Sequence, residues 1–220
     1  MFDNLLKYWF FRIQEHDYMD LNAPRGSQPQ IDWATRMRIA KGVARGLDIL
    51  HTHHNIIHEN LTSHNVLLDE DINPKISEIR MSRLLTADAN SKMIATAGTL
   101  GYQAPELSEL KKPDMKTDVY SLGVIMLELL TRKSPEKVDL SKQVQMIERG
   151  KWVPEVIDIE LQRYTSQEKM VKMLQLAIDC VSTLPKDRPD VHLVLQQLEE
   201  ISLETATSSS DDGGAGPSLS

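Results

Sequence analysis

The sequence predicts a mainly helical α+β domain with one small β-hairpin. Three stretches, at 39–50, 173–181 and 191–201, repeat apolar residues at spacings of three and four, the pattern of an amphipathic helix. A fourth stretch, 119–130, is apolar on nearly every side, which is typical of a helix buried inside a larger core. Helices therefore supply most of the expected core, and strands supply little of it.

The elements are expected in the order helix, hairpin, long loop, buried helix and further helices. The first helix is predicted over 35–50. Two short β-branched runs, at 65–68 and 74–76, flank the polar turn 69–71 and indicate a hairpin. The stretch 86–105 combines Ala, Thr, Gly and Ser with no sustained period, so it is expected to be a loop.

Composition divides the chain into three parts. Residues 1–30 are the least regular and include a run of turn-forming residues. Residues 31–203 contain all of the periodic segments and are expected to form the folded domain. Residues 204–220 are rich in Ser, Asp and Gly and carry too little apolar surface to repay ordering, so this tail is expected to be disordered.

Charge and cysteine content exclude several classes of protein. The chain has 220 residues and a formal net charge of -7, which argues against a broad nucleic-acid-binding surface. The single cysteine, Cys180, cannot form an internal disulfide and lies on an apolar helical stripe, so a buried, inert thiol is expected. No apolar run approaches the roughly 20 residues that cross a bilayer. These features predict a soluble, cytoplasmic domain with no membrane span of its own.

Several local motifs follow one another in a recognisable order. The segment 58–65 reads His-Glu-Asn-Leu-Thr-Ser-His-Asn, and Glu78-Ile79-Arg80 follows the hairpin. The segment 98–106 ends in Ala104-Pro105-Glu106, Asp118 opens the buried helix, and Arg188-Pro189 precedes the last helix. This order resembles the C-terminal lobe of a eukaryotic protein kinase, with its H-R-D-L-x-x-x-N, D-F-G and A-P-E motifs.

Further stretches narrow the resemblance. Plant receptor-like kinases contain stretches that resemble three parts of this sequence: Ile31-Asp32-Trp33, the segment 47–51 and the segment 177–181. The strongest likeness is to the leucine-rich-repeat receptor-like kinases of the inflorescence meristem group, whose catalytic motifs are also degenerate. The resemblance covers about residues 31–203, and it identifies 1–30 as a remnant of the small lobe and hinge.

The resemblance implies that the catalytic positions have lost their chemistry. The family's proton-accepting carboxylate belongs at position 60, where Asn60 carries an amide that takes no proton near neutral pH. Glu59 replaces an arginine that meets a phosphorylated activation loop, and its negative charge would repel that phosphate. Thr62 replaces the lysine that supports the transferring phosphate. No catalytic residue is therefore expected to be intact.

Two remnants of the nucleotide site remain. Asn65 keeps an amide oxygen for a metal ion, and Glu78 keeps a carboxylate that is one methylene longer than the family's aspartate. Arg80 replaces a glycine, and it either takes over the metal's charge, pairs with Glu78 or blocks the site. Binding of Mg-ATP is therefore expected to be weakened, and no cofactor or metal site is assigned with certainty.

The expected nucleotide-clamping lobe is largely missing. No Gly-rich phosphate loop and no V-A-I-K lysine precede the segment 58–65. A zinc site is also not expected, because the histidines lack zinc-ligand spacing and no cysteine is near them: His51, His53, His54, His58 and His64.

The architectural residues of the family are present. The resemblance implies that Asp118 holds the catalytic-loop backbone and that His58 packs beneath it. It also implies that Glu106, which follows Ala104 and Pro105, forms a partly buried ion pair with Arg188.

Three hypotheses follow for the function. The leading one is a receptor-like pseudokinase that acts as a scaffold or decoy for other kinases or signalling proteins, without phosphoryl transfer. The alternative is an ATP-dependent serine/threonine kinase domain of a leucine-rich-repeat receptor-like kinase, truncated in this chain and held at the cytosolic face of the plasma membrane. The third is a degenerate gene product with no stable fold. The sequence assigns no oligomeric state.

Overall fold

A computed structural model describes residues 31–79, 101–109, 112–135, 137–145 and 156–203. The predicted irregular start at 1–30, the predicted tail at 204–220 and most of the predicted loop at 86–105 lie outside these residues. The described part is mainly helical with one two-stranded antiparallel sheet, which confirms the predicted fold class. Among the described residues, no helix is long and apolar enough to cross a membrane.

Helix α2, Trp33–Asp48, packs beside α8, Val191–Leu203, along one side of the molecule. It begins two residues earlier than predicted because the Asp32 side chain accepts a hydrogen bond of 2.8 Å from the Thr35 N–H and caps the first turn. The helix then passes into a π-helical turn, Ile49–His53, which brings His51 into the interior.

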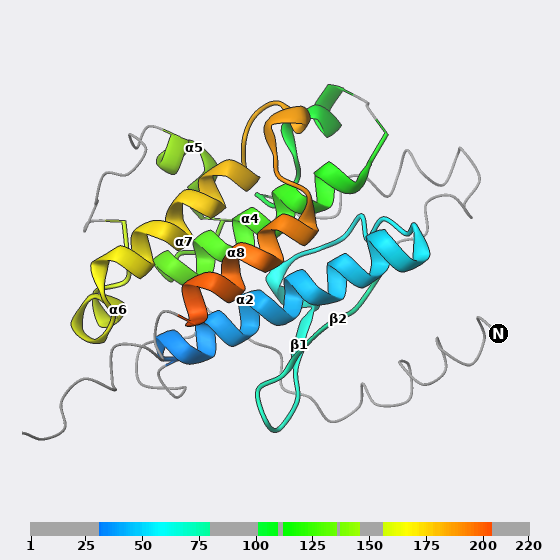
Figure 1. Ribbon diagram of the computed structural model, residues 1–220. Helices are drawn as coiled ribbons and strands as arrows, with labels where there is room; N and C mark the ends of the chain where they lie inside the picture. Colours follow the sequence, from blue (N-terminus) through cyan, green and yellow to red (C-terminus); the bar gives the residue numbers. More distant parts are fainter. Residues whose placement is uncertain (1–30, 80–100, 110–111, 136, 146–155, 204–220) are drawn as a thin grey trace, which may run out of the picture.

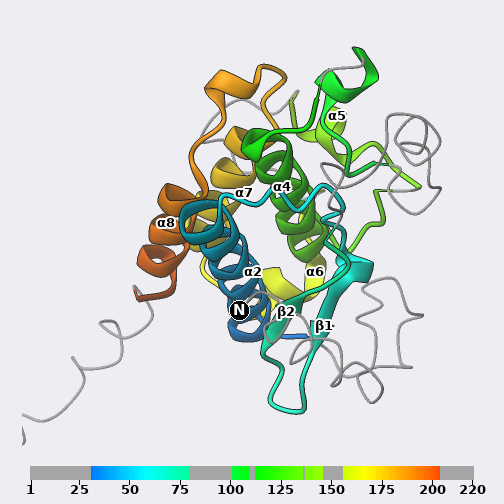
Figure 2. The same ribbon diagram turned by 90° about the vertical axis from the view of Figure 1, so that its right-hand side faces the viewer.

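The predicted buried helix is α4, Met115–Thr131, and it forms the centre of the core. Figures 1 and 2 show α2 and α7 beside it, and α8 packs against α2 and α7. Leu122, Val124 and Leu127 have no exposed surface. The helix starts at the Asp114 cap, whose carboxylate accepts from the Thr117 N–H at 3.0 Å, and it ends where Arg132 turns left-handed at φ 53°.

Helix α7, Gln167–Cys180, lies directly against α4. A Cβ at Gly123 of α4 would stand 2.7 Å from the Cys180 Cβ, so only a glycine allows this close approach. Cys180 is completely buried, as predicted, and burial raises the pKa of its thiol well above the usual range. The helix begins earlier than the predicted apolar stripe. The pattern did not mark this start because the first turn is mostly polar.

The predicted hairpin consists of β1, Val66–Leu68, and β2, Pro74–Ile76. The strands pair antiparallel, with Val66 opposite Ile76 and Leu68 opposite Pro74. The hairpin leans on α2, where Gly42 leaves room for the Pro74 ring. Val66 and Ile76 are buried, so this small sheet contributes one face to the core.

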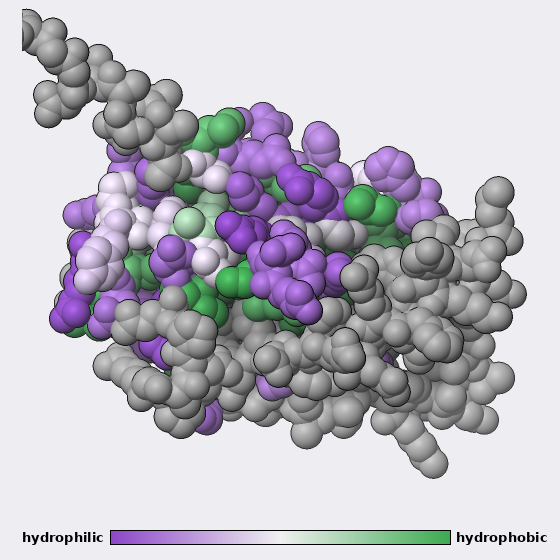
Figure 3. Space-filling view, turned by 90° about the horizontal axis from the view of Figure 1, so that it is seen from below, coloured by the Kyte–Doolittle hydropathy of each residue, from purple (hydrophilic) through white to green (hydrophobic). Residues whose placement is uncertain are grey.

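Two short helices were not predicted from the sequence. They are α5, Leu140–Gln145, and α6, Ile159–Tyr164, each of six residues. Such segments contain fewer than two helical turns, which is too short for apolar residues to repeat over several turns. The described residues of the predicted loop include the beginning of a 3₁₀ segment, Pro105–Glu109. On the face seen in Figure 3, hydrophilic residues predominate over the described surface, and hydrophobic ones appear as separate spots.

Candidate functional site

Asp118, at the start of α4, holds the segment 58–65. This segment matches the catalytic loop in the resemblance to protein kinases. One oxygen of its carboxylate accepts from the His58 N–H at 2.7 Å, and the other accepts from the Glu59 N–H at 2.9 Å. Nε2 of His51 lies 2.8 Å from the first oxygen. Because Asp118 is only 1% exposed, these donors replace the water that its charge would otherwise require. The structure thus places Asp118 where the sequence comparison put it.

His58 lies fully buried beneath this loop. Its Nδ1 accepts a hydrogen bond of 3.3 Å from the Asn60 N–H, so the ring also shapes the turn that follows it. Burial lowers the pKa of His58, since the interior disfavours the charged imidazolium. The ring is therefore neutral at physiological pH and acts as a structural acceptor.

Asn60 and Asn65 join the catalytic loop to the residues that follow the hairpin. The Asn65 side-chain amide donates to the Asn60 carbonyl at 2.8 Å. The Asn60 side-chain amide donates to the Glu78 carbonyl at 3.3 Å. The Ser77 N–H donates to the Asn65 carbonyl at 2.8 Å. The structure thereby brings together Asn60, Asn65 and the backbone of Glu78, three of the positions that the sequence singled out.

The two glutamates that stand at altered motif positions share an unusual backbone conformation. Glu59 has a φ of 62° and Glu78 a φ of 59°, both in the left-handed region that ordinary L-residues avoid. Glu78 is exposed, whereas Thr62, another replaced position, is 2% exposed. A buried hydroxyl at position 62 offers no charge to a phosphate.

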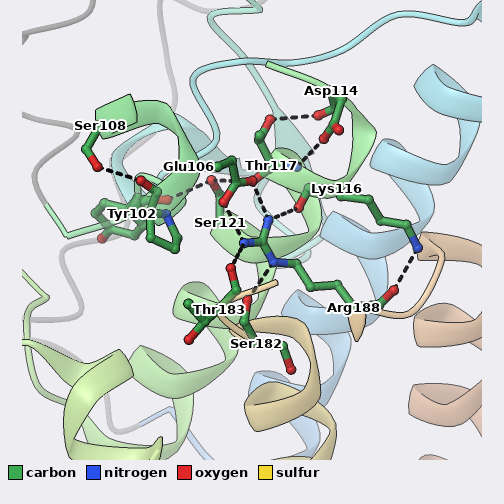
Figure 4. Close-up of polar contacts among 11 residues, drawn as sticks. Tyr102, Glu106, Ser108, Asp114, Lys116, Thr117, Ser121, Ser182, Thr183 and Arg188 are labelled. Atoms are coloured by element: carbon green, nitrogen blue, oxygen red, sulfur yellow. Dashed lines mark hydrogen bonds and ion pairs between the residues drawn. The ribbon is translucent and has the colours of Figure 1, made fainter. Parts of the chain in front are cut away.

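The ion pair between Glu106 and Arg188 is present, and it is more deeply buried than the sequence comparison implied (Figure 4). The guanidinium meets the carboxylate through two parallel hydrogen bonds of 2.6 and 2.7 Å. Arg188 also donates to the carbonyls of Ser182 and Lys116, at 2.8 and 3.0 Å. Glu106 is 7% exposed and Arg188 2%, because the neighbouring backbone covers both groups. Ala104 is buried beside this pair, and Pro105 opens the 3₁₀ segment.

Sequence reasoning missed a second buried ion pair. The Arg36 guanidinium lies 2.6 Å from the Asp158 carboxylate and also donates to the Leu129 carbonyl. It ties the start of α2 to the end of α4 and the cap of α6. A signal existed, because Arg36 stands on the apolar face of its helix, where a charge needs a partner.

A polar network inside the core was also missed. The Tyr102 hydroxyl donates to the buried Glu128 carboxylate at 2.6 Å and lies 2.7 Å from the Ser63 hydroxyl. Burial, followed by the charge of Glu128, raises the pKa of Tyr102 far above its usual range. Glu128 breaks the otherwise apolar run of α4, which was the available signal in the sequence.

A shallow pocket lies beside the catalytic loop. Its walls include Glu59, Asn60, Tyr102, Leu107 and Thr117. The pocket therefore lies between the catalytic loop, the segment 101–107 and the beginning of α4. Among the described residues, no group of three or more His, Cys, Asp or Glu side chains is arranged to hold a metal ion.

The first turn of a buried central helix holds the catalytic loop, and a buried Glu–Arg pair contacts the start of the same helix. These features define the large lobe of a protein kinase. The family model of the protein kinase domain matches residues 13–198, and the chain belongs to this family. Its resemblance to leucine-rich-repeat receptor-like kinases is confirmed by a relative in Arabidopsis thaliana, the probable leucine-rich repeat receptor-like protein kinase IMK3. The two are 53% identical over 194 residues, 86% of this chain and 25% of the relative.

Other relatives include a probable inactive receptor kinase, a pseudokinase domain and a kinase domain solved with a nucleotide analogue. A probable inactive receptor kinase of Arabidopsis thaliana is 36% identical over 90% of this chain and 32% of its own length. The chain thus spans about a quarter to a third of these curated relatives. The solved pseudokinase domain of BIR2, an immune regulator, superposes with a TM-score of 0.72 at 33% identity, covering 87% of this chain and 58% of that one. The maize SIRK1 kinase domain bound to AMP-PNP gives 0.69 at 34% identity, covering 80% and 61%.

Proposed function

We propose that this chain is a receptor-like pseudokinase that binds other kinases or signalling proteins as a scaffold or decoy and transfers no phosphate. The observation that carries the proposal is the side chain at position 60. Asn60 donates its amide to the Glu78 carbonyl, whereas a catalytic base must accept a proton from the substrate hydroxyl. We assign residues 31–203 to the lobe that performs this role.

The neighbouring positions support the loss of catalysis. Glu59 places a negative charge where the family's arginine would meet a phosphate. Thr62 is buried and uncharged, so it supplies no stabilisation to a transferring phosphoryl group. A chain with these three changes retains neither the base nor the positive charges of phosphoryl transfer.

The architecture supports a role in binding. The contacts of Asp118 and the pair between Glu106 and Arg188 keep the lobe's framework without the catalytic groups. Relatives include probable inactive receptor kinases and the pseudokinase domain of an immune regulator. Because relatives are receptor-like kinases, we place this lobe in the cytosol, at the plasma membrane when it is part of a full-length receptor.

A second candidate function is an ATP-dependent serine/threonine kinase domain that this chain holds only in part. Asn65 and Glu78 favour it, because both keep oxygen atoms that suit a magnesium ion. A solved relative, maize SIRK1, binds the nucleotide analogue AMP-PNP. If Mg-ATP bound here, the metal would screen the negative charge of its phosphates, and Asn65 and Glu78 would hold the metal.

This chain, fused to the small lobe of an active receptor-like relative and incubated with millimolar Mg-ATP and a protein substrate, separates the two candidates. We expect no phosphate transfer, with the active kinase domain of a receptor-like relative as positive control. A nucleotide present at 100 times its dissociation constant would stabilise the fold by about 2.7 kcal/mol, so a thermal melt also reports binding. We expect little or no shift. Phosphate transfer that Asn60→Ala abolishes would overturn the pseudokinase proposal.

The binding role needs its own measurement. Immobilised chain is exposed to the cytosolic kinase domains of several receptor-like kinases, with and without Mg-ATP. We expect at least one to bind at micromolar concentration or below, with the same affinity in both conditions. Failure of every domain to bind would remove the scaffold role and leave the loss of catalysis intact.

A further inference from the structure

The amide of Asn60 forms a hydrogen bond between two loops that an ionised catalytic aspartate could not form. On one side stands the catalytic loop, whose backbone Asp118 holds through the His58 and Glu59 N–H groups. On the other side stands Glu78, whose backbone is left-handed at φ 59°. The Asn60 amide nitrogen lies 3.3 Å from the Glu78 carbonyl oxygen. An ionised aspartate at position 60 could not make this bond, since a carboxylate only accepts.

The same two loops are joined at a second place. The Ser77 N–H and hydroxyl both donate to the Asn65 carbonyl, at 2.8 and 3.1 Å. The Asn65 side chain in turn donates to the Asn60 carbonyl at 2.8 Å. Residues 60, 65, 77 and 78 therefore form a continuous set of hydrogen bonds, and the Asn60 amide is the member that closes it at Glu78.

The charges around this set add a second reason for an amide. Glu59 adjoins position 60 in sequence, and the Asp118 carboxylate accepts from the Glu59 N–H. The Glu78 carbonyl also presents the negative end of its dipole to position 60. A carboxylate at position 60 would be repelled by this carbonyl oxygen, whereas an amide is neutral and offers an N–H.

We propose that Asn60 is a positioning residue that clamps Glu78 against the catalytic loop and holds the former catalytic site in one conformation without nucleotide. The replacement of the catalytic aspartate is thus a gain of a structural donor as well as a loss of a base. This inference rests on the proposed function, because a scaffold profits from a surface whose shape does not depend on ATP. It is tested without ATP or a partner, so its failure is distinguishable from failure of the scaffold role.

The test compares Asn60→Asp and Asn60→Ala with the unmodified chain by thermal denaturation and amide hydrogen exchange. Asn60→Asp is nearly isosteric but replaces the donor with an acceptor. At pH 7 we expect it to lower Tm by about 2–4 °C, the shift that corresponds to one lost hydrogen bond in a chain of this size. We expect Asn60→Ala to lower Tm less, because it removes the donor without adding charge. Exchange in residues 77–79 should become faster in both variants.

A pH series separates a lost donor from a general disturbance. A protonated aspartate can donate to the Glu78 carbonyl, so the Tm deficit of Asn60→Asp should shrink relative to Asn60→Ala as the pH falls from 7 to 4. The matched control is Asn55→Asp, which adds the same charge at an exposed, left-handed loop position and should leave Tm and exchange at 77–79 unchanged. Asn60→Asp with unchanged Tm and unchanged exchange at pH 7 would overturn the proposal, as would a deficit that does not respond to pH.

Discussion

Asp118 supports the catalytic loop through groups that do not depend on the loop's own side chains. Two of its hydrogen bonds come from the backbone N–H groups of His58 and Glu59, and His51 supplies the third contact. A change from arginine to glutamate at position 59 therefore leaves the support unchanged while it reverses the charge. This explains in physical terms how the loop keeps its support although its side chains differ from the kinase motif.

His58 makes the stability of the fold depend on pH. Burial lowers its folded-state pKa below the ordinary histidine value of 6.5, so the unfolded chain binds a proton more readily than the folded chain. The stabilising contribution is complete above pH 6.5 and is lost as the pH falls from there toward the folded pKa. We therefore expect the free energy of unfolding to decrease between pH 7 and pH 5.

Urea denaturation of the unmodified chain and of His58→Gln over this pH range measures the effect. The glutamine variant has no imidazole to titrate, so its stability should decline less steeply over the same interval. Equal slopes for the two proteins would show that other groups cause the acid sensitivity.

At the scale of elements, α2 and the hairpin depend on a close backbone approach. A Cβ at Gly42 would overlap the Pro74 ring, with Cδ only 2.8 Å away, and a proline ring cannot rotate out of the way. Gly42→Ala should therefore destabilise the fold by about 1–3 kcal/mol, the usual cost of overpacking, although alanine favours helix.

Gly46→Ala is the matched control on the same helix. Its added methyl would lie 3.2 Å from the flexible end of Ile76, which can shift slightly. Denaturation curves should place Gly46→Ala clearly closer to the unmodified protein than Gly42→Ala. If the two variants were equally stable, the fit of Pro74 against α2 would not be the constraint described here.

At the scale of the whole molecule, the pair between Glu106 and Arg188 joins segments that lie 82 residues apart. It fastens the end of the segment 101–109 to the loop between α7 and α8, and Arg188 also lies over the Tyr120 ring at 5.0 Å. Arg188→Ala should cost about 3–5 kcal/mol, because it leaves the Glu106 carboxylate buried without its cationic partner.

The control is the exposed pair between Arg45 and Glu199, whose side chains are 60% and 47% exposed. Solvent screens such a pair, so Arg45→Ala should change the free energy of unfolding by less than about 1 kcal/mol. Chemical denaturation of both variants gives the comparison. Similar losses for Arg188→Ala and Arg45→Ala would contradict the assignment of Arg188 as a buried anchor.

The central helix, the hairpin and the order of the kinase motifs could all be predicted from the amino-acid sequence. Apolar periodicity and turn residues are local, so the stretch 119–130 predicted the buried α4 and the runs around 69–71 predicted the strands. The absence of a carboxylate at position 60 could also be predicted from the sequence. Whether a side chain can accept a proton depends on the type of residue.

The contacts between groups far apart in the sequence could not be predicted and are visible in the folded chain alone. Arg36 binds Asp158, which lies 122 residues away in the sequence, and Tyr102 donates to Glu128 inside the core. The Asn60 amide donates to a backbone carbonyl. The spacing of residues along the chain indicates which face of a helix or strand each residue occupies. The partner of that residue depends instead on the path of the whole chain. Burial then decides the strength of each contact, because the cost of an unpaired polar group rises as water is excluded.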